Sequence, residues 1–564
     1  MKLKALAALV LLVGFSGVSN AQDTLAWRQA YETAQEARRD ARKIYNTPNA
    51  SPADVEQSIR ILHQAITFLD SPRVRELAQG NFYLKARSCD VYRDLITANI
   101  IAHDREQALE AFEKMADQGR YFSIPSFETD SVYAPIRSDP RYAAVVERLK
   151  LRQALWTDEA LNTPTQPDLT TAEKVAGLSL LWSQAKYNFA NFDHANIDWD
   201  KVYLDYLPLV TGTGSTIDYY RILQKFYAQL KDSHSNVYFP QSLAAQVNAR
   251  PPMRTALIEG KVYITDVFSD SLRGTGIVPG LQVMAIDGQP VLDYARQNVQ
   301  PYQSSSTSQD LEVRTFTYFL LAGPKEKPIA LELTNSAGKT WQQNVARQGY
   351  LDRVASEAIS FRKIGQTGWL IINNFEDQHI LKTYDSLFPQ INQTRALIID
   401  IRKNGGGSDY IGFHILSTLT NRPFKTSAYR IPRYTSIPVK GMEWMDYDAE
   451  KVQPDDKMYY DKPVALLIST QTFSAAEDFA VAFDYMKRGK MVGQTTGGST
   501  GQPISFTLPG GGMARICGKH DRYPDGKEFV GIGIHPDVPV DLTVADLLNH
   551  KDKTLQTAVD LLKD

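Results

Sequence analysis

Apolar residues in the first part of the chain, residues 24–155, recur every three to four positions. This period matches one face of an α-helix, so the pattern predicts helices at 25–45, 53–69 and 105–118. Successive helices of this kind pair into superhelical scaffolds. Such a region either offers a docking surface to another protein or only caps the rest of the chain, and the helical pattern alone names no partner.

A second stretch with the helical period runs from residue 171 to about residue 230, after a linker rich in Thr, Pro and Gln at 162–168. It ends in a polar turn at 231–235, and a strand-like run follows at 236–239. The turn contains His234, one of nine histidines in the chain. A histidine in such a turn serves either in catalysis or as a capping or surface residue.

Between residue 251 and about residue 345 the pattern changes to short apolar runs separated by turn residues. It predicts strands at 262–267 and 281–286, with a tight turn at Asp287-Gly288. The segment at 276–291, GIVPGLQVMAIDGQPV, resembles a PDZ domain, in which an extended peptide adds to a sheet edge. The alternative is another kind of small β domain.

From residue 358 to the end, predicted strands and helices alternate, which is typical of an α/β layer structure. The predicted strands lie at 369–373, 396–400, 464–468, 491–492, 504–508 and 514–516, and the predicted helices at 379–392, from about 474, and at 555–562. The strand at 396–400 leads into Arg402-Lys-Asn-Gly-Gly-Gly407.

The first 21 residues read as an export signal. Lys2 and Lys4 give the positive start, residues 5–15 are apolar, and Ser19-Asn20-Ala21 offers a small-residue cleavage site. No later run approaches the ~20 apolar residues of a membrane-spanning helix. We therefore expect an exported protein, periplasmic or secreted, that has no transmembrane segment.

Composition narrows the classes of function. The chain has 564 residues, 43% of them hydrophobic and 22% charged, which indicates several folded domains. Its net charge of −2 gives no reason to expect nucleic acid as a partner. Without metal-spaced His or Cys clusters or a phosphate-cradling glycine motif, we expect no metal and no cofactor. Cys89 and Cys517 are either buried thiols or a disulfide.

Ser474 stands where the strand at 464–468 gives way to a polar turn and then a helix. A serine at a strand-to-helix turn exposes its hydroxyl beside the positive end of the helix, where an acyl-transfer nucleophile would be placed. The alternative is a helix cap, because Ser474 with Glu477 three residues later also forms the capping-box pattern.

A nucleophilic serine needs a base and donors for the developing oxyanion. His234 is the best candidate base, because it lies in a polar turn ahead of a strand. Gly405, Gly406 and Gly407 follow a buried strand and expose backbone N–H groups, and the amide of Ala475 would be the second donor. The glycines would otherwise form only a loop.

Three segments resemble the core of the C-terminal processing peptidases: DIRKNGGG at 400–407, FSAAEDFA at 473–480 and GIGIHPD at 531–537. The resemblance covers about 170–560. In the Ser–Lys branch of that family a lysine base follows the serine by 25 residues, but here that position is Ser499.

The missing lysine points to the tricorn-type branch, whose site is a Ser–His–Ser–Glu set. The resemblance implies Ser474 as nucleophile, His234 as base, Ser233 as its neighbouring serine and Glu528 as the acid. For Glu528 the alternative is a solvent-facing charge. Glu477 and Asp478 are expected in the first turn of the helix, where its dipole favours acids.

The same resemblance implies a multidomain α/β fold, with a ββα core like that of crotonase and the Clp protease subunit and an inserted PDZ-like domain. The segment at 133–149 resembles the end of tetratricopeptide-like arrays. The expected domains are a signal peptide at 1–21, a tetratricopeptide-like helical region at 22–160, a helical part of the peptidase at 170–250, a PDZ-like domain at 251–350 and the catalytic core at 351–564.

The sequence thus leads us to expect an exported serine endopeptidase that acts on peptides or unfolded proteins through an acyl-enzyme. The alternative is a non-catalytic protein that binds a peptide or small ligand on the same fold, since a fold alone does not establish hydrolysis. An esterase is disfavoured because Ser474 lacks the Gly-x-Ser-x-Gly pattern. If Lys487 or Lys490 were the base instead, His234 would be dispensable.

Overall fold

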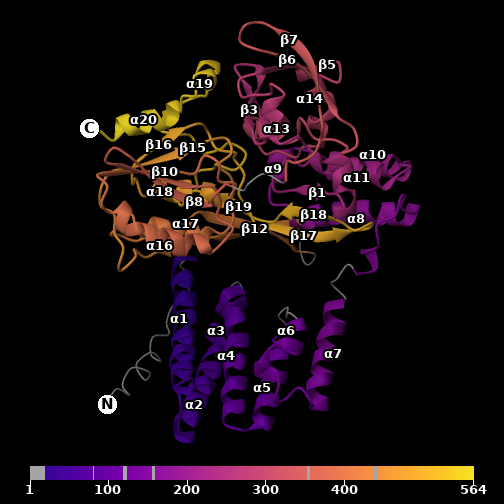
Figure 1. Ribbon diagram of the computed structural model, residues 1–564. Coiled ribbons are helices and arrows are strands. Elements are labelled where there is room, and N and C mark those ends of the chain that lie inside the picture. Colours follow the sequence, from indigo (N-terminus) through magenta and orange to yellow (C-terminus); the bar gives the residue numbers. More distant parts are fainter. Residues whose placement is uncertain are drawn as a thin grey trace. The chain divides into compact units, whose positions relative to one another are not determined.

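The computed structural model (Figure 1) describes residues 20–79, 82–118, 124–154, 159–351, 356–435 and 441–563. Its internal contacts divide the chain into two compact units, Met1–Glu159 and Ala160–Asp564. Together the described residues form a mixed helix and sheet fold.

The described part of the first unit consists of helices, and the three predicted helices are confirmed. Asp104 caps the N-terminus of one of them, and Phe112 stacks on Tyr142 in the core with ring centroids 4.5 Å apart. The helices are α1 (Asn20–Tyr45), α2 (Pro52–Leu69), α3 (Pro72–Gln79), α4 (Phe82–Ile101), α5 (Arg105–Asp117), α6 (Ile124–Thr129) and α7 (Pro140–Ala154).

The second unit begins with the predicted second helical block. Thr170 and Glu173 form a capping box at its start, and Trp199 stacks on Phe226 in its aromatic core. Its helices are α8 (Thr171–Asn188), α9 (Phe192–Ala195), α10 (Trp199–Thr211) and α11 (Thr216–Ala228). The polar turn and strand β1 (Asn236–Tyr238) follow α11, as predicted.

An antiparallel sheet follows, in which the strands predicted at 262–267 and 281–286 are confirmed. Asp287 and Gly288 have φ of 49° and 80°, which fits the predicted tight turn. The order is β2 (Met253–Ile258), β3 (Lys261–Val267), β4 (Gln282–Ile286), β6 (Ile329–Thr334) and β7 (Thr340–Val345), with β5 (Gln289–Pro290) beside β4. Helix α14 (Val291–Asn298), helix α15 (Ser308–Glu312) and a π-helical segment (Val313–Phe319) separate β5 from β6.

The central sheet of the second unit has the strand order β20-β16-β15-β10-β9-β8. The bounds are β8 (Ile359–Ile364), β9 (Thr367–Ile372), β10 (Ala396–Asp400), β15 (Val464–Ile468), β16 (Lys490–Gly493) and β20 (Val538–Pro539). Only β8 runs antiparallel to its neighbour. Every residue of β10 and β15 is buried, as expected for parallel strands that are covered on both faces.

Helices cover the two faces of this sheet (Figure 1). Leu397 and Ile399 pack in one cluster with α16 (His379–Ile391), α17 (Asp409–Ser417) and α18 (Ala475–Tyr485). Ile398 points to the other face, beside residues of α20 (Lys553–Leu561), because side chains alternate along a strand.

Adjacent parallel strands bring two loops to one edge of the central sheet. Asp400 at the end of β10 pairs with Leu467 near the end of β15. The glycine run therefore leaves the sheet beside the turn that leads to Ser474. In open α/β sheets this carboxyl edge is where ligands bind.

A smaller sheet, β1-β18-β17, joins the polar turn to the C-terminal part of the chain. Strand β18 (Gly512–Cys517) pairs antiparallel with β1, with Asn236 opposite Arg515, and with β17 (Pro503–Leu508). Because β1 directly follows the turn that contains His234, this pairing places the turn beside the segment that follows α18.

Several elements were not predicted, among them three strands and one helix of the second unit: β12 (Ala428–Thr435), β13 (Gly441–Tyr447), β19 (His520–Arg522) and α17. The strands carry many polar residues, and β12 contains Pro432, so neither alternation nor a continuous apolar run marks them. Helix α17 is short and apolar around most of its surface, which conceals the helical period.

The predicted export signal at 1–21 lies almost entirely outside the described residues. Within the described residues, no helix is both long and apolar enough to cross a membrane. Cys89 and Cys517 are buried thiols, one in each unit.

Candidate active site

Ser474 occupies the N-cap position of α18, six residues after β15 ends. Its φ of 57° and ψ of −130° are rare for a residue with a side chain, and such strain is typical of functional positions. The side chain forms no capping hydrogen bond, so the capping-box pattern does not describe its contacts. Its Oγ lies 3.1 Å from Nε2 of His234 instead.

His234 is buried between two serines. Its Nε2 faces Ser474, and its Nδ1 lies 2.8 Å from Oγ of Ser499. The ring stacks on Phe473, the residue before the candidate nucleophile, with centroids 4.8 Å apart and planes 17° apart. This stacking and the two polar contacts fix the imidazole in one orientation.

The surroundings of His234 favour its neutral form. Burial lowers the pKa of the imidazole well below its ordinary value, and the positive charges of Arg515, Arg314 and Lys519 lower it further. A histidine that is neutral at pH 7 has a nitrogen lone pair with which to accept a proton. Its base strength is modest, but its geometry suits deprotonation of Ser474.

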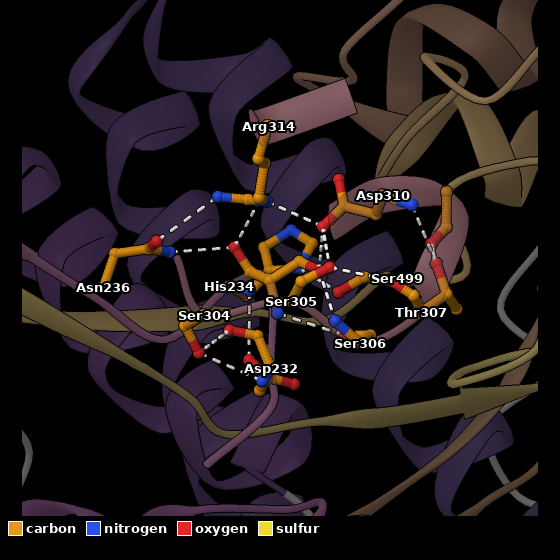
Figure 2. Close-up of polar contacts among 12 residues, drawn as sticks. Asp232, His234, Asn236, Ser304, Ser305, Ser306, Thr307, Asp310, Arg314 and Ser499 are labelled. Atoms are coloured by element: carbon orange, nitrogen blue, oxygen red, sulfur yellow. Dashed lines mark hydrogen bonds and ion pairs between the residues drawn. The ribbon is translucent and has the colours of Figure 1, made fainter. Parts of the chain in front are cut away.

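Ser233 precedes His234 but turns away from the ring. Its Oγ donates to Asp310 Oδ2 at 2.6 Å and accepts from the N–H of Ser306 at 2.8 Å, while its own N–H donates to Ser306 Oγ. Arg314 donates to Asp310 and to the carbonyl of Ser233, beside the His234 ring (Figure 2). Ser233 thus ties the histidine turn to the 304–314 segment.

Asp232 stabilises the same turn from the other side. Its buried carboxylate accepts hydrogen bonds from the N–H of His234 at 3.0 Å, from Ser235 Oγ at 2.8 Å and from Asn191 Nδ2 at 2.8 Å. Burial raises the pKa of Asp232, although these donors favour its charged form.

Glu528 does not contact the His234 ring. Its carboxylate lies 2.6 Å from Nε2 of His520, and the Nδ1 of His520 lies 2.7 Å from Oδ1 of Asn191. Because Asn191 also donates to Asp232, three hydrogen bonds lead from Glu528 to the turn that carries His234. Its role as the acidic member of the site stays a prediction.

The glycine run packs directly against Ser474. A Cβ at Gly406, whose φ is +100°, would lie 2.7 Å from Cβ of Ser474. The N–H of Gly406 donates to Oδ1 of Asn404 at 2.9 Å, so this amide already has an acceptor. The N–H of Ala475 is one of the groups at a helix start that have no partner within the helix. The oxyanion roles of Gly405, Gly406 and Ala475 remain predictions.

The roles of two residues were missed from the sequence. Ser499 contacts His234, and Glu477, which lies in the first turn of α18 as expected, binds the loop that contains Ser499 with its buried carboxylate. Burial raises the pKa of Glu477 to about 7. Position 499 stood out in the sequence only because it lacks the family's lysine, and no local pattern links it to His234.

Lys487 and Lys490, the alternative bases, lie on the surface. Lys487 pairs with Asp484, and Lys490 pairs with Asp537. Their side chains are 79% and 66% exposed, whereas the Ser474 hydroxyl faces a buried imidazole.

Comparisons with known proteins match two parts of the chain. Residues 366–540 match Peptidase family S41, and residues 176–228 match the tricorn protease C1 domain. A carboxyl-terminal-processing protease of Synechocystis sp. is 25% identical over 295 residues, which are 50% of this chain and 65% of that protein. A tricorn protease homolog of Streptomyces coelicolor is 23% identical over 394 residues, which are 65% of this chain and 30% of that protein.

The chain spans less than two thirds of the length of these relatives. Among solved structures, that of mature CPAF aligns with a TM-score of 0.57 and 17% identity, over 70% of this chain and 98% of that chain. At this identity the likeness is one of fold. The chain therefore carries a Peptidase family S41 domain and a tricorn protease C1 domain, on a fold similar to that of mature CPAF.

Proposed function

We propose that this protein is a serine endopeptidase that hydrolyses peptide bonds through an acyl-enzyme. The observation that carries the proposal is the 3.1 Å contact between Oγ of Ser474 and Nε2 of His234. A nucleophile and a base within hydrogen-bond reach are the signature of covalent catalysis, and here the serine also has a strained backbone at a helix start.

In the proposed reaction His234 accepts the proton of Ser474 as its Oγ attacks the peptide carbonyl. The imidazolium then gives this proton to the leaving amine. Water attacks the acyl-enzyme with His234 again as the base, which releases the acid product and restores Ser474. The amides of Gly405, Gly406 and Ala475 are the proposed donors for the oxyanion, and that of Gly406 would exchange its hydrogen bond to Asn404 Oδ1 for one to the oxyanion. Each such donor is worth about 3 kcal/mol of transition-state stabilisation.

The proposed site keeps the Ser–His–Ser–Glu composition of the tricorn-type branch. Ser233 and Glu528 act on His234 through the backbone of its turn, since their hydrogen bonds lead to the 304–314 segment and to Asp232. Holding the turn in place holds the ring over Ser474.

The regions around the site have proposed roles as well. The antiparallel sheet at 253–345 is proposed to be a PDZ-like module that holds an extended peptide, and 351–564 a crotonase-like ββα core. Residues 1–21 are proposed to direct export to the periplasm or beyond. Amino-terminal sequencing of the mature protein tests the last point, because cleavage after Ala21 leaves Gln22 at the terminus.

Labelling with a fluorophosphonate probe tests the proposed function without knowledge of the substrate. We expect one adduct on intact protein, located at Ser474 by peptide mass spectrometry. An adduct elsewhere would move the nucleophile. No adduct, with the protein folded, would favour the alternative of a non-catalytic binding protein.

The low pKa of His234 predicts where activity declines in acid. Only the neutral imidazole can accept the Ser474 proton, and burial holds its pKa well below 6.5. We therefore expect the acid limb set by His234 to lie below pH 6.5, apart from any change set by Glu477, whose pKa is about 7. A profile of kcat/KM against pH on a peptide substrate checks this, and a profile with no acid limb below 6.5 contradicts it.

The close approach of Gly406 to Ser474 predicts a strong effect of Gly406→Ala. The added Cβ would lie 2.7 Å from Cβ of Ser474 and 2.9 Å from the carbonyl oxygen of Phe473, so the nucleophile must shift. A displacement near 1 Å can cost about 100-fold in rate, and we expect a loss of this order in kcat. Steady-state kinetics measures it.

Gly405→Ala is the matched control for this change. A Cβ at Gly405 meets no heavy atom within 4 Å, and the substitution keeps the backbone N–H. Its loss of kcat should be much smaller. Equal losses in the two variants would show that crowding of Ser474 is not the cause.

A further inference from the structure

We infer that Ser499 is a positioning residue of this site: it holds the His234 imidazole in the catalytic tautomer, and Glu477 holds Ser499. The inference rests on the proposed function of Ser474 and His234. The residue in direct contact with the ring is then Ser499, which the family resemblance does not assign to the site.

The first observation is the environment of the His234 ring. Its Nδ1 lies 2.8 Å from Oγ of Ser499, a residue with no exposed surface. Within the described part of the chain, no carboxylate forms a hydrogen bond or ion pair with the ring. The neutral hydroxyl of Ser499 is therefore the group that faces Nδ1.

The position of the ring proton decides whether His234 can act as a base. His234 can act as base only if Nε2 carries the lone pair, because Nε2 faces Oγ of Ser474. The ring proton must then lie on Nδ1, where Ser499 Oγ can accept it. If Nδ1 had no acceptor, the ring could take the other tautomer and present an N–H to the nucleophile, which would block deprotonation.

The third observation is how firmly Ser499 is fixed. Its N–H donates to Oε2 of Glu477 at 2.8 Å, and its carbonyl accepts the N–H of Ser474 at 3.1 Å. The N–H of Gly498 and the hydroxyl of Thr496 donate to the other oxygen of Glu477. Ser499 thus connects the base to the backbone of the nucleophile.

These contacts explain the Ser-x-x-Glu spacing at 474–477. Helix α18 carries the nucleophile at its N-cap and Glu477 three residues later. The carboxylate does not close a capping box but binds the 496–499 loop that brings Ser499 to His234. One rigid helix therefore sets the positions of both serines around the imidazole.

Ser233 provides the contrast. Its hydroxyl donates to Asp310 and accepts from the N–H of Ser306, so it supports the turn and not the ring. Removal of either serine should slow the reaction, but only the loss of Ser499 should change the ionisation of His234. The two variants Ser499→Ala and Ser233→Ala form a matched pair.

The test measures the second-order rate of fluorophosphonate labelling of Ser474 across pH in the wild type and both variants. General-base catalysis accelerates a reaction about 10²–10⁴-fold, and part of this acceleration is lost when the group that orients the base is removed. Ser499→Ala should therefore slow labelling about 10- to 100-fold. Its acid limb should move to lower pH, because the imidazolium N–H loses its acceptor. Ser233→Ala should keep the acid limb of the wild type.

The outcomes separate this inference from the function on which it rests. A wild type that does not label refutes the proposed function, and the inference falls with it. A labelled wild type with Ser499→Ala within twofold of it and an unmoved acid limb overturns the inference alone. If Ser499→Ala does not fold, ¹⁵N shifts of His234 in the wild type decide. Protonation at Nδ1 supports the inference and protonation at Nε2 overturns it.

Discussion

Replacement of Ser474 by alanine is expected to abolish peptide hydrolysis, with a loss on the order of 10⁶-fold in kcat. The change removes the Oγ that His234 Nε2 contacts at 3.1 Å, and the hydroxyl that remains beside the ring, that of Ser499, contacts Nδ1 instead. The fold should be kept, because the Ser474 side chain forms no capping hydrogen bond that α18 would lose. Steady-state kinetics and fluorophosphonate labelling measure the effect.

Thermal unfolding is the necessary companion measurement. Ser474→Ala should unfold within a few degrees of the wild type, since alanine keeps the Cβ and removes only a hydroxyl that does not cap α18. Ser386→Ala, a change at an exposed serine in α16, is the control and should keep full activity. Residual hydrolysis well above the uncatalysed rate in Ser474→Ala would place the nucleophile elsewhere.

The parts of the site that could be predicted are those encoded locally or in order along the chain. Strands β10 and β15 stand out as apolar runs, and each is followed by a segment that chain order places at the same sheet edge. Their parallel pairing alone brings the glycine run to Ser474. The position of His234 between a helix and a strand was also readable.

The parts that could not be predicted depend on contacts between distant segments. The pairing of β1 with β18 is not apparent in either strand, and it helps to carry His234 to the segment after α18. Ser499 therefore has no sequence signal as a partner of His234. The resemblance drew attention instead to Ser233, but the hydroxyl of Ser233 donates to Asp310 and not to the His234 ring.

Glu528 illustrates the same limit. The family resemblance implied it as the acid of the site, and the structure places its carboxylate on His520, at one end of a series of hydrogen bonds that ends at Asp232. The resemblance could indicate this acid. It could not show that two other side chains stand between the carboxylate and the catalytic turn.

His234→Ala is expected to lose about as much activity as Ser474→Ala, because members of a catalytic unit fail together. Without the imidazole the Ser474 hydroxyl loses its base, and neither alternative lysine replaces it, since Lys487 pairs with Asp484 and Lys490 pairs with Asp537. The double variant should be no slower than either single one. A kinetic cycle of the four proteins on one peptide substrate measures this non-additivity.

The lysines supply the decisive comparison. Lys487→Ala and Lys490→Ala each remove one partner of an exposed ion pair, worth about 0.2–1 kcal/mol, and should leave kcat within twofold of the wild type. If His234→Ala lost little kcat and one lysine variant lost most of it, the Ser–Lys mechanism would be correct despite the serine at position 499. The buried contact between His234 and Ser474 argues for the opposite result, because no exposed ammonium can reach a hydroxyl that an imidazole already covers.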